Sequence, residues 1–579
     1  MSYDNISEDL KDQLKGIVGA RYYFDEIEIR WTYAFGGTIF NNNWIPELIL
    51  LPQNAQQVSL ILQIASENNI PITPRGNGTS LSAGTMTPYG GIVLDLSQMN
   101  RILSLSVENN MVVVEPGVIC DDLNHLLNQD GYFFPPDPGS SSVASIGGMV
   151  ASNAGGVQAF KYGVTKHYVL FLEVVLPDGT IVTFGSKTIK SVSSYNFTDL
   201  FVGSEGTLGV ITKIGLKIRP LPRKRKLGLF IFEKIEQVGE TALKLRREAI
   251  LPSILEFMDS FVVNAIKDHL GSTIGEMPLG HALLAEMDGE TKRDINDSFE
   301  KLLTAVLQQE PIFYKVAETE EERAKLIQVR KSSLPALSRI ASSSCVEDCS
   351  IQITDFVSVV KKIWNIPKDI NADYLKVCVA SHMEGNLHPR FLFNENDETQ
   401  VQEFEKAIKH LYEKIVLPVG GSLTGEHGIG KVKTPYLELE HGRYVVSLME
   451  KIKLLFDPKR ILNPGSGKGS LTKLHPIRSI RKLKNIDNTI LRLNCMRCGF
   501  CNATCPSRVV NMVEAYSPRG RLSILNGLIH GDLVLSDLIV QILHECTLCG
   551  HCAVICPSGV ETHRIFEKAR EIIHYNKKV

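Results

Sequence analysis

The sequence has few of the features that tie a protein to a membrane, an export route or a nucleic acid. Its first residues contain no basic segment followed by an apolar run, so we expect no signal peptide. The longest apolar run, residues 169–176, is far too short to span a membrane and contains Glu173. Lys and Arg number 62 against 64 Asp and Glu, and this balance gives no sign of a nucleic-acid partner. We expect a cytoplasmic protein that is soluble or peripheral on the cytoplasmic face of a membrane.

Two nucleotide-binding motifs are also missing. No G-x-G-x-x-G follows a predicted strand, which argues against a Rossmann NAD site, and no G-x-x-x-x-G-K-[ST] indicates a nucleoside triphosphatase. Four of the 12 cysteines are scattered, and without an export signal they are typical of reduced cytosolic thiols; they are Cys120, Cys345, Cys349 and Cys378. With 579 residues, 44% of them hydrophobic, the chain is long enough for several domains.

What the sequence does have is a run of small, turn-forming residues at 74–84. A helix predicted over 54–69, with Asn54 as its cap, and a short strand lead into this run. Glycine lets backbone N–H groups converge on an anion, so the run fits a nest for the pyrophosphate of a dinucleotide. Taken alone, an ordinary surface turn explains it equally well.

Two further stretches, 135–156 and 200–212, have the same small-residue character. The first could be a flexible linker, but its apolar residues Val143, Ile146, Met149 and Val150 have the spacing of a short packed helix. The second could be a glycine turn between buried strands. Predicted strands at 91–96 and 111–117 alternate with helices, which indicates an α/β arrangement.

These three stretches, in this order, resemble the FAD domain of the vanillyl-alcohol-oxidase (PCMH) type. From about 46 to 464 the chain resembles the FAD-linked 2-hydroxyacid dehydrogenases, which include the glycolate oxidase flavin subunit and the D-lactate and D-2-hydroxyglutarate dehydrogenases. The resemblance implies noncovalent FAD, because Thr79-Ser80 stand where some relatives attach flavin through a histidine. It implies FAD contacts at Pro74, Arg75, Gly76, Asn77, Gly78, Thr79, Ser80, Pro138, Gly139, Ser140, Ser145, Gly148, Ser152, Gly155, Gly156, Val157, Glu205, Gly206, Val210, Ile211 and Asn463.

Two histidines and a glutamate form a candidate divalent-metal set. His382 and His388 are six residues apart, and an even separation on an extended segment points both to one face. With Glu426 they make a reasonable ligand set for Zn, Mn or Fe, although residue types alone fit a structural histidine pair as well. The family pattern is His-x-Gly-Asp-Gly-Asn-x-His-Pro. This chain is one residue shorter there and has Glu384 for the Asp, so Glu384 is an extra ligand or the site is metal-free.

The catalytic candidates are His427 and Arg330. A neutral imidazole suits removal of the proton from a substrate hydroxyl, and we expect His427 to be this general base. Arg330 matches the family arginine that meets a substrate carboxylate, for which its planar fork is suited. Residues 345–348 resemble a family segment that lines the pocket, but Gln352 replaces a proline there, so the sequence does not specify the substrate.

The remaining cysteines lie in two boxes near the C-terminus, each with the spacing C-x2-C-x2-C-x3-C-P. This is the spacing of two-cluster bacterial ferredoxins, in which the fourth cysteine of each box crosses to the other cluster. We assign one [4Fe-4S] cluster to Cys495, Cys498, Cys501 and Cys556, and the other to Cys505, Cys546, Cys549 and Cys552. Zinc, which favours separated pairs, is the alternative. Residues 521–530 and 533–543 look helical, as in the ferredoxin module of respiratory iron–sulfur subunits.

The expected fold class is α+β with several domains. The expected divisions are an N-terminal helical segment at 1–45, the FAD-binding domain at 46–222, an α+β substrate cap at 223–465, a basic linker at 466–485 and the helical ferredoxin domain at 486–579. The linker is interpreted as a solvated connector, although an acidic partner or lipid headgroups would also suit it.

Together these features predict an FAD-dependent dehydrogenase of a D-2-hydroxy acid, D-lactate or glycolate, that passes electrons singly through two [4Fe-4S] clusters to a partner protein or quinone-linked acceptor. Longer relatives continue with Cys-Cys-Gly repeats that are missing here, so we expect a separate cysteine-rich or electron-carrier subunit. The sequence leaves homo-oligomerisation open. The alternative function is a non-catalytic flavin and iron–sulfur electron-transfer subunit, which the short His–His interval and Gln352 would suit.

Overall fold

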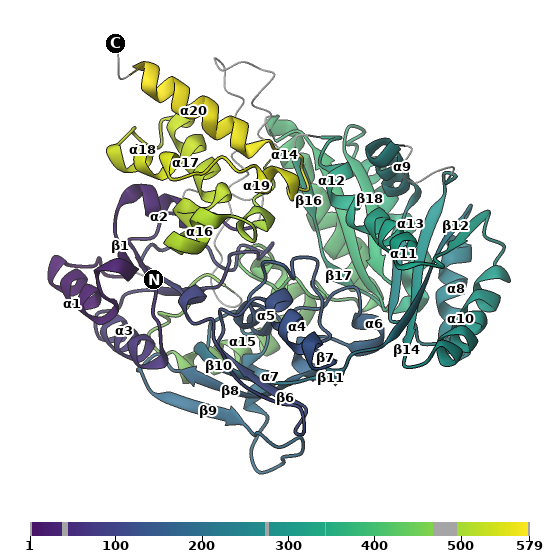
Figure 1. Cartoon of the computed structure of the whole chain (residues 1–579), viewed down its shortest axis with the longest axis horizontal. Helices are drawn as coiled ribbons and strands as arrows, with labels where there is room; N and C mark the ends of the chain where they lie inside the picture. The colour runs from purple at the N-terminus through teal and green to yellow at the C-terminus, as the bar shows by residue number, and fades with distance from the viewer. Residues whose placement is uncertain are drawn as a thin grey trace.

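The computed structural model describes residues 3–37, 44–271, 277–341, 343–395, 397–466 and 495–576 (Figure 1). Apart from Ser466, the predicted basic linker lies outside the described residues. Among the helices that are described, none combines the length and the apolar character needed to cross a membrane.

The N-terminal segment and the start of the predicted FAD-binding region share a small sheet of order β1-β2-β4-β3, in which β2, β4 and β3 run parallel. Helix α3 packs on this sheet and starts at the Asn54 cap, whose side chain accepts a hydrogen bond from Gln57 N, so the predicted helix and cap are confirmed. The bounds of this part are α1 (Glu8–Val18), β1 (Tyr23–Phe24), α2 (Ile27–Tyr33), β2 (Leu48–Leu50), α3 (Ala55–Glu67), β3 (Ile72–Arg75) and β4 (Ile92–Asp95).

A second sheet, of order β5-β6-β10-β8-β9, is antiparallel throughout. Helices α4 and α5 share a buried core with its central strands. The short helix expected near residues 143–150 is confirmed as α5, with Ile146, Met149 and Val150 buried. The bounds are β5 (Ile102–Ser106), β6 (Met111–Val114), α4 (Cys120–Gln129), β7 (Tyr132–Phe133), α5 (Ile146–Ser152), α6 (Ala159–Tyr162), β8 (Val169–Val175), β9 (Ile181–Gly185), α7 (Phe197–Phe201), β10 (Val210–Lys217) and β11 (Arg219–Pro220).

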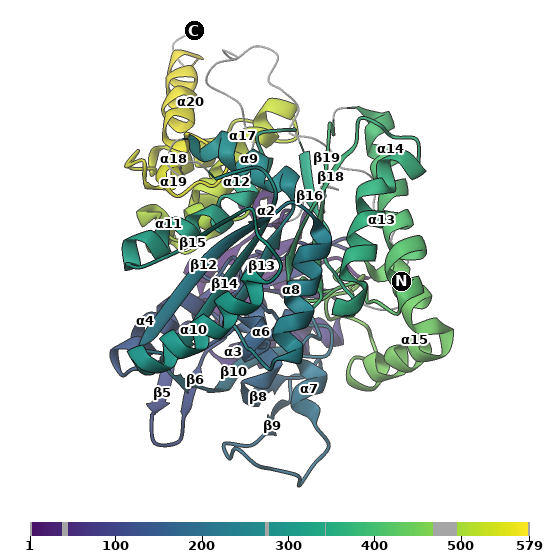
Figure 2. The same ribbon diagram turned by 90° about the vertical axis from the view of Figure 1, so that its right-hand side faces the viewer.

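The cap is built on a large antiparallel sheet of order β15-β12-β14-β13-β18-β19-β16, with β17 also paired to β19 (Figure 2). Helices α8, α10, α13 and α14 share a core with one face, and α9, α11 and α12 with the other. The strands are β12 (Lys224–Phe232), β13 (Ile254–Met258), β14 (His281–Gly289), β15 (Phe313–Val316), β16 (Ser343–Val346), β17 (Cys349–Ser350), β18 (Lys376–His382) and β19 (Asn386–Phe393). The helices are α8 (Ile235–Arg247), α9 (Ser260–Leu270), α10 (Lys292–Leu307), α11 (Glu320–Lys331), α12 (Ser333–Leu337), α13 (Phe356–Asp369), α14 (Glu398–His410) and α15 (Leu437–Phe456).

The C-terminal helices form a module that lies against helix α2 (Figure 1, yellow against purple). Trp31 of α2 is buried in the core of this module, and its indole N–H donates to Ser523 O at 2.9 Å. The helices expected at 521–530 and 533–543 correspond to α17 and α18, although α18 begins only at Asp537. The bounds are α16 (Pro506–Asn511), α17 (Pro518–His530), α18 (Asp537–His544), α19 (His551–Val554) and α20 (Thr562–Asn576).

Candidate active site and cofactor cavity

One cavity of about 1330 Å³ is lined jointly by the FAD-binding region, the cap and the C-terminal module. It exceeds the roughly 300–1,000 Å³ of a typical small-molecule pocket, so it has room for a dinucleotide beside a small substrate. All the residues predicted to contact FAD line this cavity except Gly156 and Asn463. Arg330, His382, His388, Glu426 and His427 line it too.

The glycine loop at 76–78 is suited to bind an anion. Arg75 borders the cavity, but its side chain is buried beneath this loop rather than extended into the open space. Its side chain is 2% exposed, and its Nη1 donates to Phe35 O at 2.9 Å. Its Nη2 is a buried donor with no hydrogen-bond partner among the described residues. Gly78 has a φ of +62°, and a side chain there would collide with this guanidinium. An orphan cationic donor beneath a glycine loop suits a pyrophosphate.

Asn463 lies behind the cavity wall and holds two of its segments together. Its Nδ2 donates to Gly84 O at 2.9 Å and to Glu205 O at 2.7 Å, while its Oδ1 accepts from Lys431 Nζ at 2.8 Å. The structure therefore gives Asn463 a bracing position rather than a place on the cavity surface.

The Glu205 carboxylate holds the Gly-Glu-His-Gly segment against the FAD-binding region. Its two oxygens accept hydrogen bonds from Ile429 N at 2.7 Å and Gly430 N at 2.8 Å. Glu205 itself has a φ of +53°, a conformation that a non-glycine residue adopts only where the surroundings impose it. Glu205 thus connects the predicted FAD wall to the backbone that follows His427.

His382 and His388 do face each other, but for a reason different from the one predicted. They do not lie on one extended segment, because the chain turns after His382 and forms the β18–β19 hairpin. In that hairpin His382 pairs with Asn386 and Ala380 pairs with His388, so the two imidazoles lie on neighbouring strands. Their ring centroids are 4.9 Å apart.

The predicted metal set converges in the structure. His382 Nε2 and His388 Nε2 lie 3.2 and 3.3 Å from the same oxygen, Glu426 Oε1. Two imidazoles and a carboxylate whose ligand atoms all lie within 4.8 Å of one another suit Zn, Mn or Fe. Glu384 is outside this set, and burial raises its pKa to about 7, so the structure gives no support to an extra ligand there.

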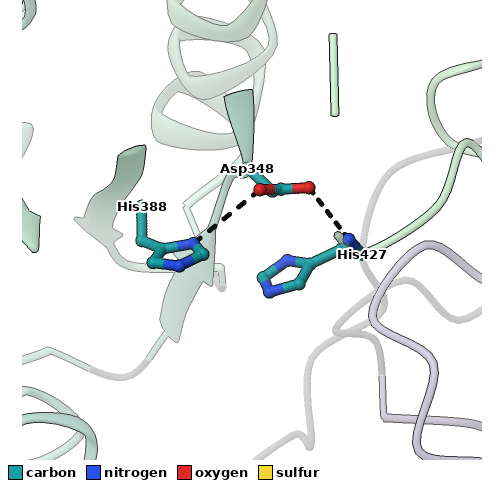
Figure 3. A group of neighbouring side chains, drawn as sticks. All are labelled: Asp348, His388 and His427. Atoms are coloured by element: carbon teal, nitrogen blue, oxygen red, sulfur yellow. Dashed lines mark hydrogen bonds and ion pairs between the residues drawn. The ribbon is translucent and has the colours of Figure 1, made fainter. Parts of the chain in front are cut away.

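The Asp348 carboxylate holds the backbone of the segment that carries Glu426 and His427. Figure 3 shows its contact with His427. Its Oδ2 accepts hydrogen bonds from four donors, Thr424 Oγ1 and the backbone N–H groups of residues 425–427, at 2.5 to 3.0 Å. Burial would raise the pKa of the Asp348 carboxyl group. The neighbouring side chains of His427, Lys433 and His388 outweigh burial and hold this pKa well below its ordinary value. The sequence analysis suggested only that residues 345–348, which include Asp348, line the pocket.

Glu256 on β13 is a site residue that the sequence reasoning missed. It is fully buried, and its Oε2 accepts from Arg330 Nε at 2.6 Å while Oε1 contacts His382 Nδ1. Burial alone would raise its pKa, but His382 and Arg330 outweigh burial and lower it. A carboxylate behind a metal-binding histidine fixes the imidazole orientation. The only signal was a single Glu inside the apolar strand 254–258.

The electrostatics separate His427 from its neighbours. Burial lowers the pKa of His427, so the imidazole is neutral near pH 7. Burial also disfavours charge on His382, but Glu256 and Glu426 raise the pKa of that imidazole well above the ordinary value. The His427 ring stacks on His388 at 5.1 Å between centroids. A general base must be unprotonated before it accepts a proton, and the neutral His427 imidazole meets this condition.

Seven of the eight box cysteines line one of two cavities. Cys495, Cys498 and Cys556 line the large cavity, whereas the half-buried Cys501, predicted to share their cluster, is not among its lining residues. The other four line a separate cavity of about 10 Å³; they are Cys505, Cys546, Cys549 and Cys552. Each group combines residues from both boxes.

Arg519 of the C-terminal module reaches the first nest. Its Nη2 donates to Asn77 O at 2.8 Å and its Nη1 to Gly78 O at 3.3 Å. Glu514 binds the same guanidinium through two hydrogen bonds, of 2.6 and 2.9 Å. This buried pair, which we call the module clamp, was not predicted.

Three family models match the chain. They are FAD binding domain over residues 46–185, FAD linked oxidases, C-terminal domain over residues 221–466, and 4Fe-4S dicluster domain over residues 493–560. The order is that of the FAD-binding region, the cap and the C-terminal module.

Similar curated proteins include Glycolate oxidase subunit GlcD of Bacillus subtilis, 37% identical over 79% of this chain and 97% of that protein. D-lactate dehydrogenase of Anaerostipes hadrus is 31% identical over 80% of this chain and 98% of its own length. Among solved structures, p-cresol methylhydroxylase has a TM-score of 0.66 at 17% identity and covers 80% of this chain and 98% of its own. At that identity the likeness shows the PCMH-type fold alone.

Proposed function

The chain belongs to the FAD-linked oxidoreductases related to glycolate oxidase and D-lactate dehydrogenase, with a C-terminal 4Fe-4S domain, and from that premise we propose that it oxidises a D-2-hydroxy acid to the 2-oxo acid. We infer further that the electrons leave through two [4Fe-4S] clusters to a partner protein or quinone-linked acceptor. D-lactate and glycolate are the first substrates to test.

One observation carries the proposal. A single cavity is bordered by the glycine nest, by Arg330 and the histidines, and by cysteines of one predicted cluster. The proposed substrate site, the proposed flavin site and the proposed exit for electrons would therefore border one cavity. A flavin site unconnected to the cysteines would not favour an internal electron relay.

The roles of the side chains follow from their contacts. Arg330 is held by Glu256 through Nε and by Ser333 Oγ, which accepts from Nη1 at 3.3 Å, so Nη2 is the nitrogen left to bind a substrate carboxylate. His427 is neutral and accepts the proton of the substrate hydroxyl. Asp348 fixes the backbone of His427, and Glu205 fixes the residues that follow it.

The cofactors supply what these side chains lack. FAD held at the glycine nest would supply a two-electron hydride acceptor, and [4Fe-4S] clusters held by the cysteines would supply one-electron carriers. A divalent ion, held by His382, His388 and Glu426, would lower the pKa of the substrate hydroxyl. The residues present fit these groups: an orphan cationic donor at the nest, two imidazoles with a carboxylate, three cysteines on the large cavity and four on the small one.

The order of the clusters follows from the cavity. Cys495, Cys498 and Cys556 border the flavin space, so the cluster that they bind with Cys501 is the nearer one. We expect Cys549→Ser to leave one cluster that substrate can reduce. Cys498→Ser should abolish reduction of both by substrate, although dithionite still reduces the one that remains. Electron paramagnetic resonance of the substrate-reduced proteins measures this difference, and equal behaviour would contradict the order.

The function is tested on anaerobically purified protein. Its iron, sulfide and flavin are measured first, and zinc in place of iron would contradict the relay. Mixing with D-lactate, glycolate and D-2-hydroxyglutarate should then bleach the flavin absorbance with at least one acid. Reoxidation should be faster with a quinone than with O2. Bleaching by no acid would favour the alternative of a flavin and iron–sulfur electron-transfer subunit without its own substrate.

A further inference from the structure

Arg390 is a buried cavity residue that the mechanism above does not use. It lies on β19 two residues beyond His388, so the two side chains are on the same face of the strand. It lines the large cavity and is 8% exposed. Neither Nε nor Nη1 has a hydrogen-bond partner among the described residues.

Three other arginines of the cap and the module, each less than about a fifth exposed at the side chain, bind carboxylates. Arg330, Arg323 and Arg519 each place Nε 2.6 Å from a carboxylate, of Glu256, Glu286 and Glu514 respectively. A buried charge without a partner costs several kcal/mol on general grounds. Arg390 differs from these three arginines because no carboxylate of the described residues binds its Nε or Nη1. We therefore infer that its anion comes from outside the chain.

The strands that flank Arg390 do not offer that anion. In the sheet its position is paired with Cys378 on one side and Val346 on the other. The Arg390 guanidinium carries a positive charge at neutral pH, because an arginine side chain stays protonated in proteins. Glu395 lines the same cavity, but no hydrogen bond joins it to the Arg390 Nε or Nη1.

We propose that Arg390 binds a second carboxylate of the substrate, so that the preferred substrate is a 2-hydroxy acid with two carboxylates. This inference rests on the proposed function. Alternate residues of a strand are about 7 Å apart, so Arg390 lies one such step beyond the histidines where the hydroxyl binds. That step matches the scale of a four- or five-carbon diacid. Arg330 takes the carboxylate next to the hydroxyl, and Arg390 takes the distal one through its planar fork.

The test compares diacids with monoacids in one protein. Anaerobic flavin reduction is measured with D-malate, D-2-hydroxyglutarate, D-lactate and glycolate, as the rate constant divided by the dissociation constant. We expect a diacid to exceed D-lactate, and Arg390→Leu to lower the diacid-to-lactate ratio about 10- to 100-fold, the range for a hydrogen-bonded charge. Arg339→Leu is the matched control, because Arg339 also lines the cavity but is exposed, and the ratio should stay unchanged.

A binding measurement separates this inference from the proposed function. Calorimetry should show 2-oxoglutarate binding more tightly than pyruvate, and Arg390→Leu should remove the difference even if no acid bleaches the flavin. Glu395→Gln should preserve it. If Arg390→Leu does not fold, Arg390→Lys, which keeps the charge, should retain part of the preference.

Two results would overturn the inference. One is equal binding of both oxo acids to the unaltered protein. The other is an equal loss for all four hydroxy acids in Arg390→Leu together with weaker formation of the sulfite adduct of the flavin, which would assign Arg390 to the flavin itself.

Discussion

The histidine site and the cysteine module differ in how they are encoded. The cysteines are predicted by local spacing, since each box holds its ligands within eleven residues. The histidine site is assembled from β13, the β18–β19 hairpin and the segment at 424–427, and these three parts are far apart in sequence. The ligand atoms of His382, His388 and Glu426 lie within 4.8 Å of one another. The buried carboxylates of Glu256 and Asp348 balance the positive charge of the side chains around them. The spacing motif therefore predicts the cysteine ligands, whereas only the fold shows the carboxylates of Glu256 and Asp348 beside the histidines.

The largest expected effect tests whether His427 acts through chemistry or through packing. We expect His427→Ala to retain FAD but to slow anaerobic flavin reduction by substrate by about 10²- to 10⁴-fold, the contribution of a general base. The matched control is His441→Ala, because Glu440-His441-Gly442 repeats the Glu-His-Gly sequence on a partly exposed helix. Reduction of His427→Ala at the normal rate would remove His427 from its role.

The module clamp provides a comparable test at the other region. Glu514→Gln leaves Arg519 buried without its carboxylate, and we expect it to destabilise the docked module by about 3–5 kcal/mol. The emission of Trp31, which is buried in that interface, reports the transition in denaturant. Glu240→Gln breaks an equally short but exposed pair with Arg247 and should cost at most about 1 kcal/mol. Equal shifts for the two variants would show that the clamp is only a surface contact.

The pH dependence of the clamp is a finer measure. Burial disfavours charge on Glu514, but Arg519 outweighs burial and lowers the pKa to about 2. A carboxyl group with a lowered pKa contributes stability above its ordinary pKa and loses it as the pH falls toward the folded value. We expect on the order of 3 kcal/mol to be lost between about pH 4.5 and pH 2. The stability gap between the unaltered protein and Glu514→Gln should close over that range; a constant gap would exclude ionisation as its cause.

The smallest effect concerns Glu256. Removing the carboxylate behind His382 should weaken divalent-metal binding about 10- to 100-fold, as measured by competition with a chelator. Glu286→Gln is the matched control, because Glu286 is also a buried carboxylate on this sheet and binds Arg323 at the same 2.6 Å. If both variants bind metal equally, Glu256 serves only to hold Arg330.

Local patterns predicted much of this molecule. The Asn54 cap, helix α5 and the two helices between the cysteine boxes follow from residues close in sequence. The contacts of Arg330 with Glu256 and of Arg519 with Asn77 join positions 74 and 442 residues apart, and no periodicity reports such pairs. The two histidines do lie together, but they do so across the β18–β19 hairpin rather than along one extended strand, as the sequence analysis assumed.

The burial of Trp31 against Ser523 has a consequence for how the protein is made. These residues are 492 positions apart, so the side of α2 that packs on the C-terminal module stays uncovered until almost the whole chain has left the ribosome. We therefore expect the cysteines of the C-terminal module to take up iron and sulfide at about the time that the module buries Trp31 of α2. A nascent chain halted before residue 506 should therefore depend on chaperones that cover exposed apolar surface, and completion of the tail should release it from them.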